Sequence, residues 1–72
     1  MAMEVQVVVW CVPEDGHLVK WLADVHGCRL LRSWPRREGT KTVTEWRCYP
    51  QDAEGFRRAI GKMRGMFATV HL

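Results

Sequence analysis

The residues that could carry chemistry in this chain are three cysteines, three histidines and one serine. Nucleophilic catalysis needs a nucleophile, a base and an orienting group that converge in one cleft. Ser33 lies in a predicted strand, and the chain has neither a G-x-S-x-G turn nor a P-loop. Cys48 with a histidine is a conceivable pair, but a buried structural cysteine is the better interpretation of Cys48. The sequence therefore predicts no catalytic residues and no enzyme.

The spacing of the histidines and cysteines also argues against metal and disulfide sites. His17 and His26 stand about two and a half helical turns apart, so they do not face each other at ligand spacing. Cys11, Cys28 and Cys48 are odd in number, widely spaced and without a CxxC pair, unlike a secreted disulfide framework. All three fall in predicted strands, where a free cysteine behaves as a small buried hydrophobe. We expect no metal and no cofactor.

Length and composition limit the class of protein. The chain has 72 residues, 47% of them hydrophobic, and a formal net charge of +3. A chain of this length forms one domain, here residues 1–72. The first residues, MAMEVQ, lack the charged and apolar regions of a signal peptide, and no apolar run approaches the roughly 20 residues of a membrane helix. We therefore expect a cytoplasmic protein without a membrane partner. The mildly basic charge does not select a partner by itself.

Hydrophobic periodicity predicts the first half of the fold. Residues 4–12 are β-branched and apolar on both faces, which predicts a central strand. After the break at PEDG, residues 16–26 have helical spacing, with Asp15 placed to cap the first turn and Gly27 placed to end the helix. The apolar stripe of this helix is expected to hold Leu18, Trp21, Leu22 and Val25.

The second half begins with a hairpin of strands at residues 28–35 and 40–49, joined by the turn RREG. The second of these strands alternates, and the sequence leaves open which of its faces points inward. A helix over residues 51–64 follows, ended by Gly65, and its expected apolar stripe holds Ala53, Phe56, Ile60 and Met63. The run FATVHL is expected to form the last strand.

This β-α-β-β-α-β order in about 70 residues is typical of the ferredoxin-like fold. Right-handed crossovers place both helices on one face of the sheet. We expect an α+β domain with a four-stranded antiparallel sheet in the order 4-1-3-2. The apolar first strand would be central, and the strand with Arg29 and Arg32 would lie at an edge, where charge is tolerated.

Two predicted surfaces could bind a partner. The sheet face without helices is expected to carry Val8, Trp10, Leu31, Val43, Arg47, Tyr49 and His71. Exposed apolar patches usually mark interaction surfaces, so Val8, Trp10, Arg47 and Tyr49 are the candidate contacts on this face. The hairpin adds a basic group of candidate contacts, namely Arg32, Trp34, Arg36, Arg37 and Lys41. Guanidinium groups pair with phosphates, and an exposed tryptophan can stack on a base.

The run VQVVVWCVPEDGHLVKWLADVHGCRLL resembles the start of an ACT domain, which has the same element order and a D-x-P-G-x-L-type loop after its first strand. The ending, FRRAIGKMRGMFATVHL, is also similar. The loop departs from the family pattern because Pro13 precedes Glu14, Asp15 and Gly16. The resemblance implies an amino-acid ligand held by Asp15 and Gly16 at a subunit interface, with dimerisation through sheet edges or helices.

We expect a small non-enzymatic regulatory module that acts through protein–protein interaction, as an adaptor or inhibitor of the phage type. Tryptophan and arginine, which both predicted surfaces carry, are enriched at binding hot spots. A homodimer would also cover the open sheet face. Two alternatives stay open: an ACT-like amino-acid sensor, and a domain that binds single-stranded nucleic acid or RNA. The RNP1 pattern of RNA-recognition domains is absent from TKTVTEWRCY.

Overall fold

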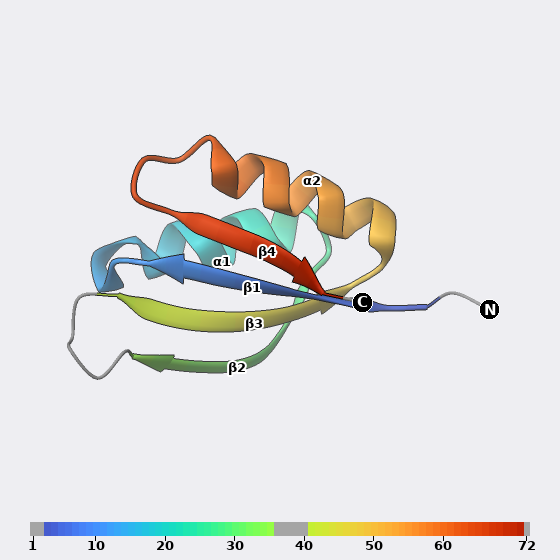
Figure 1. Cartoon of the computed structure of the whole chain (residues 1–72), viewed down its shortest axis with the longest axis horizontal. Coiled ribbons are helices and arrows are strands. Elements are labelled where there is room, and N and C mark those ends of the chain that lie inside the picture. Colours follow the sequence, from blue (N-terminus) through green and yellow to red (C-terminus); the bar gives the residue numbers. More distant parts are fainter. Residues whose placement is uncertain (1–2, 36–40, 72) are drawn as a thin grey trace.

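The structure is a computed structural model that describes residues 3–35 and 41–71, with only the backbone described at Trp34 and Pro35. Within these residues the chain forms four strands and two helices (Figure 1). In chain order they are β1 (Val5–Cys11), α1 (Gly16–Val25), β2 (Arg29–Pro35), β3 (Thr42–Cys48), α2 (Pro50–Gly61) and β4 (Phe67–His71), with a short 3-10 turn at Pro13–Asp15 before α1. No helix among the described residues is long and apolar enough to cross a membrane.

The strands form one antiparallel sheet in the order β2-β3-β1-β4, which is the predicted 4-1-3-2 order read from the other edge. The ferredoxin-like arrangement is therefore confirmed. The apolar strand β1 is central, between β3 and β4, and β2 forms an edge. Right-handed crossovers explain this order, because each helix must return the chain over a neighbouring strand.

The core lies between the sheet and the two helices. Val7 and Val9 of β1 are fully buried, as is Phe56 of α2. The indole of Trp46 on β3 meets the ring of Phe56 edge-on at 5.9 Å between centroids. Trp46 and Cys48 belong to this core, which settles the face of β3 that points inward.

The predicted apolar stripe of α1 is wrong for two of its four residues. Trp21 and Val25 are each 60% exposed, whereas the buried residues of α1 are Val19, Leu22 and Ala23. The side chain of His26, just after α1, lies against Gly55 of α2, so this side of the helix is covered by its neighbour. Trp21 and Val25 lie on an exposed flank of α1. Helical spacing predicts which residues share the apolar side of α1, but it does not predict how much of that side the neighbouring elements cover.

The ends of the helices follow the sequence at some positions and not at others. Gly27 has φ +71° and ends α1, as its left-handed tolerance predicts. Asp15 occupies the position before α1, but its side chain makes no capping hydrogen bond, contrary to the prediction. The helix α2 ends at Gly61, and Gly65 takes its positive φ in the turn that follows.

Strand β2 contains a register shift between Leu30 and Arg32. Arg29 pairs with Arg47 before the shift, and Arg32 pairs with Glu45 after it. Because directly paired residues share a face, Arg29 and Arg32 project from the same face. In a regular strand, residues three positions apart would project from opposite faces. The strict alternation assumed along this strand therefore fails at the shift, and the pairing register assigns Leu31 to neither face.

Candidate binding surface on the open sheet face

The sheet face opposite the helices, called the open face below, is organised in three rows that run across the strands. Residues opposite each other in antiparallel strands project to the same side. The rows follow from the pairing register and run from β2 to β4. They are Trp34–Val43–Trp10–Phe67, Arg32–Glu45–Val8–Thr69 and Arg29–Arg47–Gln6–His71, with Trp34 placed by its backbone alone.

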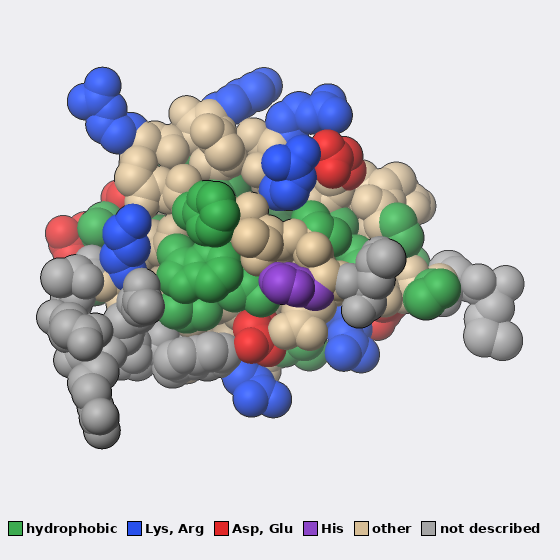
Figure 2. Space-filling view, in the orientation of Figure 1, with side chains coloured by type: hydrophobic (Ala, Val, Ile, Leu, Met, Phe, Trp, Pro, Cys, Tyr) green, Lys and Arg blue, Asp and Glu red, His purple; other side chains and the backbone are tan. Residues whose placement is uncertain are grey.

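The first row carries the apolar part of the open face. The rings of Trp10 and Phe67 contact each other with centroids 5.4 Å apart and planes tilted by 44°. Phe67 is 58% exposed, and Trp10 is partly buried. Figure 2 looks onto this face and shows hydrophobic side chains gathered in a compact group with basic side chains around its margin. This arrangement presents one protruding aromatic ring that a second ring supports from the side.

Two valines on this face are less accessible than the sequence suggested. Val8 and Val43 lie on the open face, but their exposed fractions are 9% and 7%. Both belong to the inner strands of the sheet, which have a neighbouring strand on each side. The contact of Val8 with a partner stays a prediction, and the more exposed apolar residue of the open face is Phe67.

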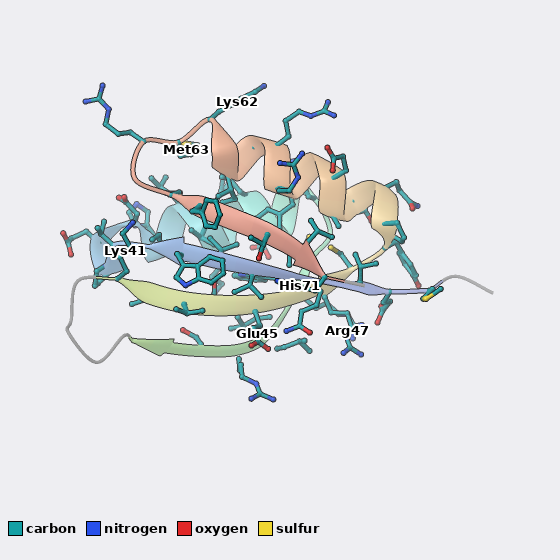
Figure 3. All side chains as sticks on the ribbon, in the orientation of Figure 1. Lys41, Glu45, Arg47, Lys62, Met63 and His71 are labelled. Atoms are coloured by element: carbon teal, nitrogen blue, oxygen red, sulfur yellow. The ribbon has the colours of Figure 1, made fainter. Side chains whose placement is uncertain are left out.

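The charges of the open face are unevenly compensated. Arg29 forms an ion pair with Glu4 at 2.7 Å, and Arg32 approaches Glu45 at 3.7 Å. Lys41 and Arg47 have no acidic partner within the part of the chain that the structure describes. Figure 3 shows Lys41 near one end of the face and Arg47 toward the other, with Glu45 between them. The described part of the face therefore holds an excess of positive charge at both ends of β3.

The structure brings together part of the predicted basic hairpin. Arg32 lies on the same side of the sheet as Trp10, and Lys41 precedes β3 near one end of the open face (Figure 3). Arg36 and Arg37 lie outside the described residues, so their predicted contacts stay predictions. Tyr49 follows β3 and is 44% exposed.

The predicted ACT-like ligand loop has an ordinary local geometry. The backbone N–H of Asp15 donates to the carbonyl of Val12 at 3.0 Å, and the chain then enters α1. Gly16 has a right-handed backbone with φ −56°, and no atom lies within 4 Å of a side chain built there. The chain itself thus does not require glycine at this position. The amino-acid site at Asp15 and Gly16 stays a prediction.

The cysteines are buried and free. Burial raises the pKa of Cys28, and the neighbouring thiol of Cys48 raises it further. Burial also raises the pKa of Cys48, although a hydrogen bond with Cys28 partly offsets the effect. The thiolate is the nucleophilic form, so both side chains are weak nucleophiles at neutral pH. No three His, Cys, Asp or Glu side chains of residues 3–35 and 41–71 are grouped as a metal site requires.

Sequence reasoning missed Phe67 and Arg29 as residues of the open face. Phe67 could have been found, because it is four positions before His71, which alternation had already placed on that face. Arg29 could also have been assigned from the strand start, where no register shift yet intervenes. Comparison with protein-family models and with curated proteins found no match for this chain. The site must therefore be interpreted from its own residues.

Proposed function

We propose that this protein is a non-enzymatic binding module, an adaptor or inhibitor, that docks its open face onto another protein. The observation that carries the proposal is the exposed ring of Phe67, which rests against Trp10 within a surface of polar side chains. Binding hot spots consist of such an aromatic anchor surrounded by contacts that exclude water. A reducing compartment such as the cytoplasm suits its three free thiols.

The partner should offer an apolar pocket with an acidic rim. Phe67 would fill the pocket, because burying its exposed ring removes apolar surface from water. Lys41 and Arg47 would face the acidic rim, since no carboxylate within the described residues neutralises them. Charges at the margin of an interface act more on the association rate and on specificity than on affinity.

Single-stranded nucleic acid is the second candidate ligand. The same two uncompensated cations favour it, because they share a face with an exposed aromatic ring. Two features favour a protein instead. Glu45 places a carboxylate in the middle row of the face, and the open-face positions of β3 carry no aromatic ring to stack a second base. We therefore place the protein partner first.

The test uses three single variants of the full chain, each first checked for native folding. Phe67→Ser removes the proposed anchor, Arg47→Glu reverses one cation, and Trp21→Ser is the matched control. Trp21 is 60% exposed on α1, so its loss removes a comparable aromatic surface away from the open face. Each protein is immobilised and exposed to a nuclease-treated lysate of the source cells, and the retained proteins are quantified. Parallel titrations use mixed single-stranded oligonucleotides at two salt concentrations.

We expect the wild type and Trp21→Ser to retain the same partner protein. Phe67→Ser should lose this binding, and Arg47→Glu should weaken it. A protein retained equally by all four would contradict the assignment of the open face. Loss with Trp21→Ser alone would move the interface to the exposed flank of α1. Salt-sensitive oligonucleotide binding that both open-face substitutions abolish would replace the protein partner with nucleic acid.

A further inference from the structure

The two edges of the sheet differ in their protection against strand addition. Natural edge strands are protected by bulges, by charged side chains and by proline. Strand β2 has all three, namely the register shift between Leu30 and Arg32, the arginines Arg29 and Arg32, and Pro35. Strand β4, with the sequence FATVH, contains no lysine, arginine or proline. It pairs with β1 over all five residues without a shift.

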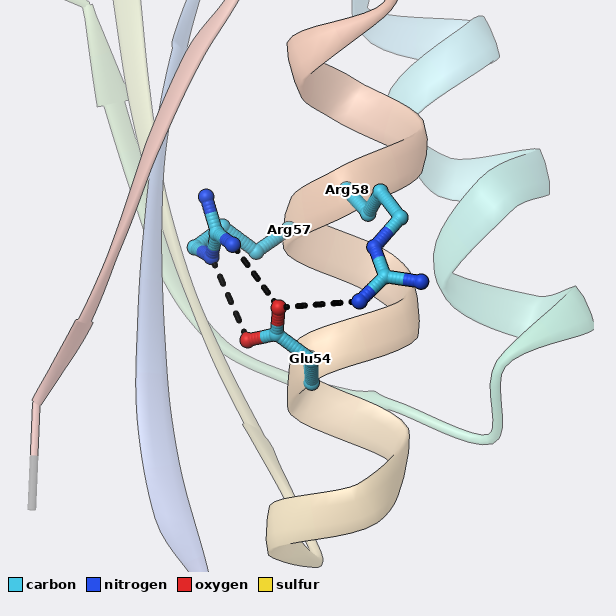
Figure 4. A network of polar contacts seen from close by, with 3 residues as sticks. All are labelled: Glu54, Arg57 and Arg58. Atoms are coloured by element: carbon cyan, nitrogen blue, oxygen red, sulfur yellow. Dashed lines mark hydrogen bonds and ion pairs between the residues drawn. The ribbon is translucent and has the colours of Figure 1, made fainter.

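The surroundings of β4 leave this edge accessible. Phe67 is 58% exposed and Val70 is 36% exposed, one on each face of the sheet. On the helix side, two arginines of α2 donate hydrogen bonds to the carboxylate of Glu54 (Figure 4). The donor–acceptor distances are 2.8 Å from Arg57 and 3.4 Å from Arg58. This local pairing limits the charge that α2 presents beside the edge. Among residues 3–35 and 41–71, no backbone hydrogen bond outside the sheet involves β4, so its outer backbone groups are available to another strand.

The sequence of β4 is complementary to itself in one antiparallel register. With a two-fold axis at Thr69, the threonine of one copy faces the threonine of the other, and Thr–Thr pairs are favourable across strands. Phe67 then faces His71 on the open face, and Ala68 faces Val70 on the helix face. This register joins all five residues of β4, and no pair opposes two arginines, two lysines or two carboxylates.

We propose that a second copy of this chain adds to β4 in this register, so that two four-stranded sheets become one eight-stranded sheet. A two-fold interface uses the same patch on both copies, which this register satisfies. The proposal does not depend on the identity of the partner of the open face. A five-residue strand makes a small interface, so the association is reversible and depends on concentration.

The experiment places charge on the two-fold axis. Thr69 is partly exposed. Its replacement by Lys or Glu puts two like charges opposite each other in the dimer, whereas in the monomer the new charge faces no like charge across the edge. Sedimentation equilibrium over about two orders of magnitude of protein concentration gives the dissociation constant. Ser33→Lys, which adds the same charge to an exposed position of the other edge strand, is the matched control.

We expect a monomer–dimer equilibrium for the wild type and for Ser33→Lys. Thr69→Lys and Thr69→Glu should each weaken self-association at least tenfold, and an equimolar mixture of the two should dimerise again. A wild type that stays monomeric up to its solubility limit overturns the proposal. So does a dimer that both charged variants leave unchanged, or one that Ser33→Lys disrupts as strongly.

A cross-link provides a second test that needs no charged variant. Thr69→Cys should form a disulfide between copies under a mild copper oxidant, because facing Cβ atoms in an antiparallel pair lie about 4.5–5.5 Å apart and need to approach by only about 1 Å to reach disulfide geometry. Val70→Cys faces Ala68 of the second copy and should cross-link far more slowly. The native cysteines are buried and do not compete. Equal cross-linking at both positions overturns the register. The outcome is independent of the lysate experiment, which reports on binding by the open face.

Discussion

Alkaline pH should destabilise this protein through its two neighbouring buried thiols. Cys28 is 6% exposed and Cys48 is 2% exposed, and burial raises the pKa of both. Below the ordinary thiol pKa of 9.0 both cysteines are protonated in the folded and the unfolded chain, so they add no pH dependence. Above it the unfolded chain ionises while the folded chain keeps its protons. The free energy of unfolding must therefore fall as the pH rises above about 9.

The magnitude follows from proton linkage. A thiol that ionises only in the unfolded chain lowers the free energy of unfolding by about 1.4 kcal/mol between pH 8 and pH 10. Cys28 and Cys48 together set an upper limit of about 2.7 kcal/mol over this interval. A domain of this length has a total stability of about 4–11 kcal/mol, so the loss is large enough to measure.

Urea denaturation at pH 8, 9 and 10 measures this loss directly. The double substitution Cys28→Ala and Cys48→Ala removes both thiols, and it should flatten the pH dependence although it lowers the stability at pH 8 through lost packing. Every other ionisable side chain remains in the double variant, so that variant acts as an internal control for their contribution. An alkaline slope that is equally steep in both proteins would refute the assignment to these thiols.

Two further predictions concern the core and the chain turns. Val7→Asp should abolish folding, because Val7 is fully buried and an unpaired carboxylate there costs several kcal/mol, whereas Trp21→Asp on the exposed flank should remain folded by circular dichroism. A native spectrum for Val7→Asp would refute the core assignment. Gly27→Ala should lower the stability by about 1–2 kcal/mol, because its φ of +71° disfavours a side chain. Gly61→Ala, in open space at the end of α2, should not lower the melting temperature.

The fold was predictable because several independent patterns agreed. Apolar residues on both faces of residues 4–12 predicted a central strand, and β1 lies between β3 and β4. Right-handed crossovers then allowed one order for the other strands. Alternation in β3 gave its two faces, and the packing of Trp46 against Phe56 determined which face is inward.

The register of β2 was not predictable by alternation, because a single inserted residue exchanges the two faces of a strand. Alternation from Leu31 puts Arg32 on the opposite face, whereas the pairing register places Arg32 on the open face opposite Glu45. The sequence holds one signal for this shift. Two adjacent leucines between Arg29 and Arg32 break the alternation, and an irregularity at that point lets both arginines reach a carboxylate.

Exposure on the open face was less predictable than orientation, and the difference bears on function. Val8 points to the open face but is only 9% exposed, so the accessible apolar surface lies at the edge on Phe67.

A residue at an edge of the sheet can take part in two contacts at once. In the proposed dimer, Phe67 leaves the edge of a four-stranded sheet and stands near the middle of an eight-stranded one, beside His71 of the second copy. Binding by the open face and self-association through β4 would then share Phe67. Thr69→Lys acts on both contacts, because Thr69 lies on the two-fold axis and also in the middle row of the open face. The disulfide of Thr69→Cys, which reports on self-association alone, therefore separates the two.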